Sequence, residues 1–193
     1  MLQPEPLEIL IYPNPFLTKP CRTITREEIK TGKAEGLDLA QLTARMKMSM
    51  YAAEGVGLAA PQVGVGLRLF IVDISKDKSG VFEVLNPVLS DLHGSVLEEE
   101  GCLSIPEVRA KVKRHANVKM TGITLKGEPL SIDASDLLAR VCQHETDHLN
   151  GVLFIHKIGM TAKLLIRRQL IELEEDYELQ QKRKRAGVRS QKS

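Results

Sequence analysis

The spacing of hydrophobic residues predicts helices in four parts of this chain. Between residues 38 and 53, apolar side chains recur every three or four positions, which is the period of an amphipathic helix. Residues 25–28 form a capping box for a short helix. A third helix is predicted to begin after Ser135 and to end near Gly151, and a fourth spans about 162–185.

Other segments are rich in branched and aromatic residues, which is typical of strands. Pro129 places the last of them at the edge of a sheet, because proline cannot donate a ladder hydrogen bond. The helices and strands do not alternate regularly, so we expect an α+β fold with mainly antiparallel strands around the helix of residues 136–150 and a C-terminal helix. The predicted strands are 67–74, 81–85, 108–112, 118–125 and 130–132, whereas 55–62 is predicted to interrupt regular structure.

Length and charge distribution predict one domain followed by a basic tail. The chain has 193 residues, with neither an internal repeat nor a linker that would divide it. Residues 182–193 contain six basic residues and no acidic one, whereas the rest has 21 basic and 25 acidic residues. We therefore expect a single domain over 1–181 and a disordered tail over 182–193. The tail could make a weak contact with the ribosome or other RNA, but DNA is not an expected partner.

Several classes of protein are excluded by composition. No stretch approaches the roughly 20 apolar residues that a membrane span requires. Three cysteines are too few for a disulfide scaffold, and the first residues resemble neither a secretory signal nor a transit peptide. We therefore expect a cytoplasmic protein whose cysteines are thiols or metal ligands.

The strongest chemical signal is the sequence His144-Glu145-Thr146-Asp147-His148. On a helix, side chains four positions apart lie about 40° apart around the axis, so both imidazoles can bind one metal ion. In this H-E-x-x-H arrangement the glutamate acts as the general base. The motif therefore predicts a catalytic metal site on the third helix.

The residues alone leave the third metal ligand open. A metzincin would have histidine at position 154, which is Phe154 here. The thiolate of Cys102 would be a strong ligand for a first-row metal, although Cys21 and Cys142 are expected to be ordinary buried residues. His156 lies two residues after position 154, beyond the predicted end of the helix. A glutamate from a downstream helix is the remaining alternative, with Glu172, Glu174 and Glu175 as candidates.

Three motifs together resemble the signatures of the peptide deformylase family. They are residues 55–62 (GVGLAAPQ), residues 100–104 (EGCLS) and residues 143–148 (QHETDH). The motifs occur in the order and at the separations of that family, and the resemblance covers roughly residues 5–175. The resemblance implies a hydrolase that removes the formyl group from the N-terminal formylmethionine of nascent bacterial proteins and releases formate.

The resemblance also implies the metal site. Cys102, His144 and His148 would be the protein ligands, and water would take the fourth position. The implied ion is Fe²⁺, with Zn²⁺, Ni²⁺ or Co²⁺ as substitutes. Cysteine and histidine spacing alone would favour zinc, so the expectation of iron depends on the resemblance.

Catalytic roles follow from the resemblance residue by residue. Glu145 would take a proton from water and deliver it to the departing amine. The side-chain amide of Gln62 and the backbone N–H of Leu103 would stabilise the negative charge on the formyl oxygen. Asp147, held by Arg114, is a candidate to orient a metal-bound imidazole.

Substrate contacts are implied in the same way. Val56, Gly57 and Gly101 would lie along the substrate, where their backbone can pair with an extended peptide. Arg109 would contact the peptide beyond the methionine. Arg140, one turn before His144 on the same face, stands where an aliphatic residue is expected for an apolar methionine pocket. Its methylene groups could line that pocket while its charge reaches water.

Alternative functions remain at this point. A zinc-dependent peptidase or amidase could use the same helix, and a non-catalytic protein could use the metal to stabilise its fold. Substitution of Glu145 by glutamine distinguishes these classes, because a structural site would tolerate the change. An RNA-binding module would instead depend on residues 182–193.

Overall fold

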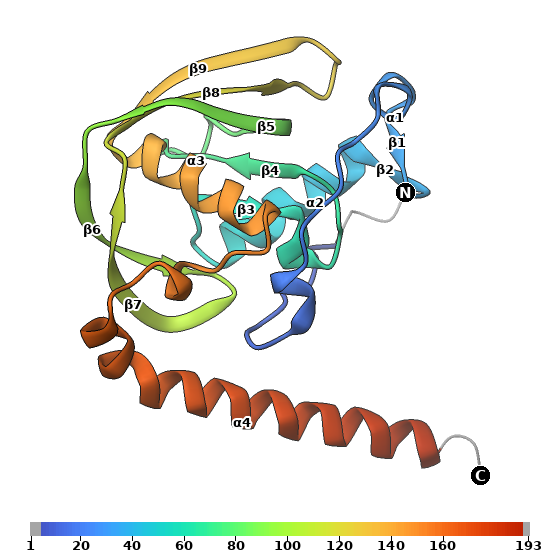
Figure 1. The fold of residues 1–193 in the computed structure, drawn as a ribbon. Helices are drawn as coiled ribbons and strands as arrows, with labels where there is room; N and C mark the ends of the chain where they lie inside the picture. Colours follow the sequence, from blue (N-terminus) through green and yellow to red (C-terminus); the bar gives the residue numbers. More distant parts are fainter. Residues whose placement is uncertain (1–4, 191–193) are drawn as a thin grey trace.

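The computed structural model describes residues 5–190, with side chains described up to residue 184. A five-stranded sheet has the order β3-β4-β5-β8-β9, and every neighbouring pair is antiparallel. A separate antiparallel hairpin and a very short pair complete the strands (Figure 1). The strands are β1 (Lys33–Ala34), β2 (Leu37–Asp38), β3 (Gly57–Ala59), β4 (Leu69–Val72), β5 (Phe82–His93), β6 (Val96–Cys102), β7 (Ile105–Arg114), β8 (Asn117–Ile123) and β9 (Pro129–Ser135).

Four α-helices accompany the strands, so the predicted α+β class is confirmed. The Thr25 hydroxyl accepts from the backbone N–H of Glu28 at 3.2 Å, and the Glu28 carboxylate accepts from the N–H of Thr25 at 2.9 Å. The predicted capping box is therefore present. The helices are α1 (Arg26–Thr31), α2 (Leu39–Ala52), α3 (Asp136–Leu149) and α4 (Met160–Ser190), with 3₁₀ turns η1 (Pro15–Thr18), η2 (Ala60–Val63) and η3 (Phe154–His156).

Helix α3 lies at the centre of the fold, beside the curved sheet (Figure 1). Its side chains Ala139, Cys142 and Leu149 are buried in one cluster with Phe70 of β4 and Val84 of β5. This packing fixes the rotation of α3 about its axis, because its apolar stripe must face the sheet. The opposite face, which carries the H-E-x-x-H motif, therefore points away from the sheet core.

The end of α3 requires glycine. Gly151 has a φ of 72°, as predicted for a left-handed stop after the helix. A Cβ atom at this position would lie 2.4 Å from the carbonyl oxygen of Thr18. The close approach fixes the end of the helix against the N-terminal segment.

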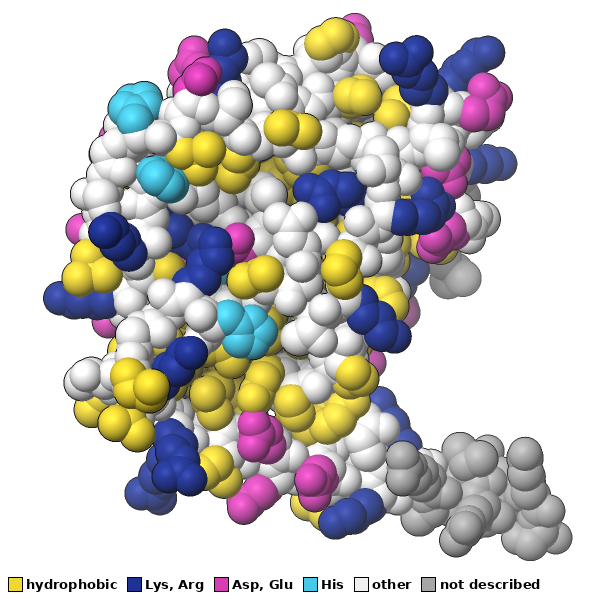
Figure 2. Space-filling view, in the orientation of Figure 1, with side chains coloured by type: hydrophobic (Ala, Val, Ile, Leu, Met, Phe, Trp, Pro, Cys, Tyr) yellow, Lys and Arg dark blue, Asp and Glu magenta, His cyan; other side chains and the backbone are white. Residues whose placement is uncertain are grey.

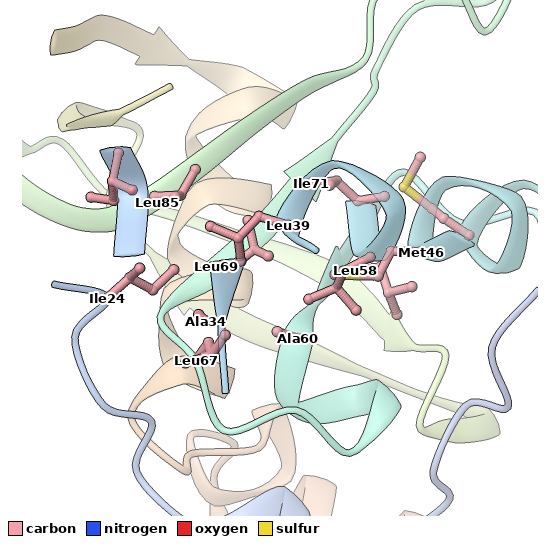
Figure 3. Close-up of a cluster of buried hydrophobic side chains, with 13 residues drawn as sticks. Ile24, Ala34, Leu39, Met46, Leu58, Ala60, Leu67, Leu69, Ile71 and Leu85 are labelled. Carbon is pink, nitrogen blue, oxygen red and sulfur yellow. The ribbon is translucent and has the colours of Figure 1, made fainter. Parts of the chain in front are cut away.

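A second core cluster packs α2 against the strands. Figure 3 shows Leu39 and Met46 of α2 beside Leu58 of β3 and Leu69 and Ile71 of β4. Burial of each such side chain contributes about 1.5–3 kcal/mol to stability. Because Leu58 belongs to this core, its neighbour Gly57 is held firmly beside the functional site.

Strands β1, β2, β3 and β6 are absent from the sequence prediction, and β5 is longer than predicted. β3 lies within 55–62, so the prediction that this segment interrupts regular structure is wrong there. β6 contains the acidic run 98–100, which is atypical of a strand. It forms because it pairs along its length with β7, from Val96 opposite Arg114 to Cys102 opposite Ile105. Pairing with a distant partner, and not local composition, determines this strand.

The C-terminal helix begins at Met160 and continues to Ser190. Residues 182–190 are therefore helical, in contrast to the disordered tail predicted from residue 182, whereas 191–193 lie outside the described residues. Lysine and arginine are good helix formers, and adding residues to an established helix is favourable. The helix already formed by 160–181 thus explains the difference.

The first half of α4 packs against the body of the protein. Ile166, Leu170 and Leu173 pack with Ile105 and Val108 of β7. Further along, α4 extends away from the body (Figure 1). In the orientation of Figure 2, hydrophobic side chains gather on the lower part of the face, next to α4. No helix in the described part of the chain is both long enough and apolar enough to cross a membrane.

Candidate active site

Three side chains from two elements converge on one point. His144 and His148 lie one turn apart on α3, and Cys102 is the last residue of β6. The Nε2 atom of His148 lies 3.2 Å from Sγ of Cys102 and 3.2 Å from Nε2 of His144. The three ligand atoms are within 4.8 Å of one another. One thiolate and two imidazoles suit a first-row divalent metal, and three protein ligands leave a coordination position open.

The other candidates for the third ligand have different partners. The Nδ1 atom of His156 accepts from the backbone N–H of Leu153 at 3.2 Å. Glu174 accepts from Tyr12, and Glu172 accepts from Arg168. Within the described residues, Cys102, His144 and His148 are the group that could hold a metal, so these alternatives are wrong. The ring of Phe154 stacks on His144 with centroids 6.4 Å apart.

Glu100 holds one of the imidazoles. The Nδ1 atom of His144 donates to Oε2 of Glu100 at 3.1 Å. Arg114 donates to the same carboxylate through Nε at 2.8 Å and Nη2 at 2.9 Å. Burial raises the pKa of Glu100, but the hydrogen bonds from Arg114 outweigh this effect and bring the pKa to about 2. Glu100 is therefore a carboxylate that fixes the tautomer of His144, with Nε2 directed toward the other two ligands.

Asp147 has a less direct role than the one predicted for it. Its carboxylate accepts from Arg114 and lies 2.7 Å from Nζ of Lys157. The predicted contact between Asp147 and Arg114 is present, but the carboxylate that meets an imidazole belongs to Glu100. Asp147 thus holds the arginine that in turn holds Glu100.

Glu145 is buried next to the three ligands. Its Oε2 atom has no hydrogen-bond partner among the described residues. A buried polar oxygen without a partner marks a place for a polar group such as water or the metal's solvent ligand. Burial raises the pKa of Glu145 to about 7, although the neighbouring His144 opposes the shift. A carboxylate with a pKa near neutrality is well suited to accept and return a proton.

Gly57 makes room for this glutamate. A Cβ atom on Gly57 would lie 2.4 Å from Oε1 of Glu145 and 2.9 Å from a methyl carbon of Val141. Neither neighbour can easily move, because Glu145 and Val141 are both buried on α3. The first motif therefore needs glycine at this position for a steric reason.

The Gln62 amide is fixed at both ends. Its Oε1 accepts from the backbone N–H of Ala59 at 2.8 Å. Its Nε2 donates to Oγ of Ser104 at 3.1 Å and lies 3.5 Å from Sγ of Cys102. Leu103 lies in the two-residue turn between β6 and β7, next to these groups. The structure thus brings Gln62 and Leu103 to the metal cluster, and Ser104 emerges as an additional contact.

A cleft of about 630 Å³ opens beside these groups. β3 forms the edge of the main sheet, so one side of its backbone is not paired with another strand. The side chain of Arg109 is largely exposed, and its Nη1 lies 3.8 Å from Glu99. Predicted residues that line the cleft are Val56, Gly57, Gln62, Gly101, Cys102, Leu103, Arg109, Arg140, His144 and Glu145.

A family model described as polypeptide deformylase matches residues 6–163. The chain belongs to the peptide deformylase family. The three motifs that carried the resemblance lie within the matched region. Members of this family are metallo-hydrolases that remove the N-formyl group of nascent peptides, and the chain is an enzyme of this kind.

Individual peptide deformylases are similar to nearly the whole domain. The enzyme of Thermodesulfovibrio yellowstonii is 42% identical over 165 residues, which cover 84% of this chain and 95% of the relative. A crystal structure of the Legionella pneumophila enzyme has a TM-score of 0.77 at 36% identity, covering 91% of this chain and 97% of that one. A plant peptide deformylase has a TM-score of 0.82 at 34% identity, with 91% and 92% covered.

Sequence reasoning missed two residues of the deformylase site. Glu100 and Ser104 both flank Cys102 in the second motif, where only the cysteine and its neighbours Gly101 and Leu103 were given roles. Their position within the EGCLS motif was the one feature of the sequence that could have pointed to a role for them. Their partners in the site, Gln62 for Ser104 and His144 for Glu100, lie 42 and 44 positions away and could not be deduced from spacing alone.

Proposed function

We propose that the chain hydrolyses the formyl amide of N-terminal formylmethionine in newly made proteins, releasing formate in the cytoplasm. Residues 1–181 make up the catalytic domain. The observation that supports this function best is the cluster of Cys102, His144 and His148 with the buried carboxylate of Glu145 beside it. Cys102, His144 and Glu145 line a cleft large enough for the end of a peptide.

Cys102, His144 and His148 would hold one divalent metal ion, Fe²⁺ in the cell, with Zn²⁺, Ni²⁺ or Co²⁺ as substitutes. The mixed thiolate and imidazole donor set accommodates each of these ions. When bound, the ion lowers the pKa of water toward neutrality and polarises the formyl oxygen. Glu100 keeps His144 in the tautomer that metal binding requires.

Glu145 handles the proton. It accepts the proton of the attacking water and returns it to the nitrogen of the departing amine, so that formate and a free amino group result. Its buried Oε2 atom has no hydrogen-bond partner among the described residues, so it is available to contact that water. Gly57 leaves the space in which this carboxylate sits.

Gln62 and Leu103 stabilise the charge that develops on the formyl oxygen. The Gln62 Nε2 carries two protons: one is donated to Ser104, and the other is directed toward Sγ of Cys102, 3.5 Å away. The second can be donated to the oxyanion, together with the backbone N–H of Leu103. Removal of one such donor typically slows a reaction by about 10²–10³-fold.

The substrate lies as an extended peptide along the cleft. Val56 and Gly57 at the edge of β3 and Gly101 at the end of β6 offer backbone groups, and Arg109 contacts the chain beyond the methionine. Pairing through the main chain reads no side chains, which suits an enzyme that acts on many nascent proteins. The basic end of α4 makes a weak electrostatic contact with ribosomal RNA.

Formate release from a formyl-Met tripeptide tests this function. Protein purified anaerobically and loaded with Fe²⁺ would be compared with Glu145→Gln and with Glu175→Gln, which changes an exposed glutamate of α4. We expect equal metal content in all three and formate release from the wild type and Glu175→Gln only. No release from the metal-loaded wild type would overturn the proposal, and cleavage of unformylated peptides would favour a peptidase.

A further inference from the structure

The segment of residues 7–12, which we call the N-terminal strap, connects the two loops that carry Gln62 and Leu103. The backbone N–H of Leu10 donates to the carbonyl oxygen of Gln62 at 2.7 Å. Two residues later, the N–H of Tyr12 donates to the carbonyl oxygen of Ser104 at 2.8 Å. The side chains of Gln62 and Ser104 are themselves hydrogen-bonded. The strap therefore joins η2 to the turn between β6 and β7.

The strap is anchored at both ends by helices outside the cleft. The hydroxyl of Ser49 on α2 accepts from the N–H of Leu7 at 2.7 Å and donates to its carbonyl oxygen at 2.8 Å. The Tyr12 hydroxyl donates to Oε1 of Glu174 on α4 at 2.6 Å. Burial and the Glu174 carboxylate raise the pKa of Tyr12 to about 12, so the phenol keeps its proton at every pH relevant to the enzyme.

This arrangement bears on catalysis because the proposed oxyanion donors come from different parts of the chain. The Gln62 amide belongs to η2, whereas the Leu103 N–H belongs to the turn that also contains Ser104. Both donors must point at the same oxygen, and catalytic groups lose much of their effect when displaced by an ångström. Because the strap is hydrogen-bonded both to η2 and to the β6–β7 turn, it fixes the separation of the two donors.

We propose that Tyr12 and Glu174 are positioning residues for deformylation, acting through the strap on the separation of the two oxyanion donors. Neither residue is among those that line the cleft, so their effect is exerted through Ser104 and Gln62. Helix α4 thereby contributes to turnover from outside the site. This inference depends on the roles proposed for Gln62 and Leu103.

Steady-state kinetics of deformylation test the inference. Tyr12→Phe removes only the hydroxyl, and Glu174→Ala removes its acceptor. For both variants we expect kcat to fall about tenfold with KM nearly unchanged, since a misplaced catalytic group costs up to about 10²-fold. Glu174→Gln keeps an acceptor oxygen and should restore most of the rate. The control Glu172→Ala breaks an exposed pair with Arg168 on the same helix and should leave kcat unchanged.

A double-mutant cycle identifies the route of the effect. If the strap acts through Gln62, the Gln62→Ala substitution should reduce kcat by a smaller factor in the Tyr12→Phe background than in the wild type. Equal factors in both backgrounds, or a wild-type kcat in both Tyr12→Phe and Glu174→Ala, would overturn the inference. The proposed function is tested by a different result: it would be overturned if the metal-loaded wild type released no formate. Thermal unfolding of each variant ensures that only folded enzymes are compared.

Discussion

The Oε2 atom of Glu100 is shared between Nδ1 of His144, at 3.1 Å, and Nη2 of Arg114, at 2.9 Å. One buried carboxylate thus neutralises a buried arginine and orients a metal-binding imidazole. The metal site and the interior of the β6–β7 hairpin are consequently parts of the same hydrogen-bond network. Damage to the network should therefore be measurable both in metal affinity and in stability.

The first prediction concerns this carboxylate. In Glu100→Gln the charge that orients His144 and compensates Arg114 is lost, so metal affinity should fall about 10–100-fold. The free energy of unfolding of the metal-free protein should also decrease, because the buried Arg114 loses one of its two ionised partners and keeps only Asp147. Competition with a chelator measures the affinity, and urea unfolding measures the stability. Glu98→Gln, at an exposed position of the same strand, should change neither quantity.

The second prediction concerns the space beside Glu145. Gly57→Ala would place a Cβ atom 2.4 Å from Oε1 of Glu145, so either the carboxylate or β3 must shift. We expect a loss of kcat of about 10²-fold or more, since the displaced group is the proposed base, while the metal remains bound. Gly159→Ala is the matched control, because a Cβ there meets nothing within 4 Å. Full activity of Gly57→Ala would contradict the steric explanation.

A third prediction concerns acid stability. Burial raises the pKa of Asp73, but hydrogen bonds from Ser75 and Tyr51 outweigh it, and the net pKa is lowered. A carboxyl whose pKa is lower in the folded state stabilises the protein above its unfolded pKa of about 3.9, and this contribution is lost as the pH falls. Asp73→Asn should therefore be less stable than the wild type at pH 7.

Urea unfolding between pH 7 and pH 3 measures this difference. The stability of the wild type should decline more steeply with acidification than that of Asp73→Asn, so the two curves should approach each other. Asp91→Asn changes an exposed carboxylate and should follow the wild type. Parallel curves for Asp73→Asn and the wild type would show that Asp73 is not responsible for the pH dependence of the free energy of unfolding.

A fourth prediction separates the two halves of α4. A chain ending at Gln181 keeps Ile166, Leu170, Leu173 and Glu174, which connect the helix to the body of the protein. It should therefore deformylate a short peptide at the wild-type rate and unfold at the same temperature. Its affinity for ribosomes should fall, and the loss should be greatest at low salt, because the removed residues act by charge. Unchanged ribosome affinity would exclude the proposed RNA contact.

Features that depend on residues close together in the sequence could be predicted, whereas contacts between residues far apart in the sequence could not. His144 and His148 lie on one helix face by their spacing alone, and the capping box of α1 and the glycine after α3 are also local signals. The predicted Ser135 cap of α3 is not formed, because the Ser135 hydroxyl bonds the side chain of Asp136. The β6 strand and the bond between Glu100 and His144 are different, because each depends on partners far along the chain. The three motifs could be assembled into one site beforehand only through the family resemblance.

The helical state of residues 182–190 shows a similar limit. Their composition is compatible with either a solvated coil or the continuation of a helix, and the outcome depends on whether a docked helix precedes them. Ile166 and Leu170 provide that docking by packing on β7. The prediction of a helix over 162–185 located its core correctly but placed its end too early.

Cys102 and His148 are 46 positions apart in sequence, so the three metal ligands meet only when the β6–β7 hairpin has docked against α3. The unfolded chain presents no comparable site, and metal binding is therefore linked to folding. At a free metal concentration of about a thousand times the dissociation constant, this linkage would stabilise the native state by about 4 kcal/mol. Metal supply would then govern how long the enzyme survives as well as how fast it turns over.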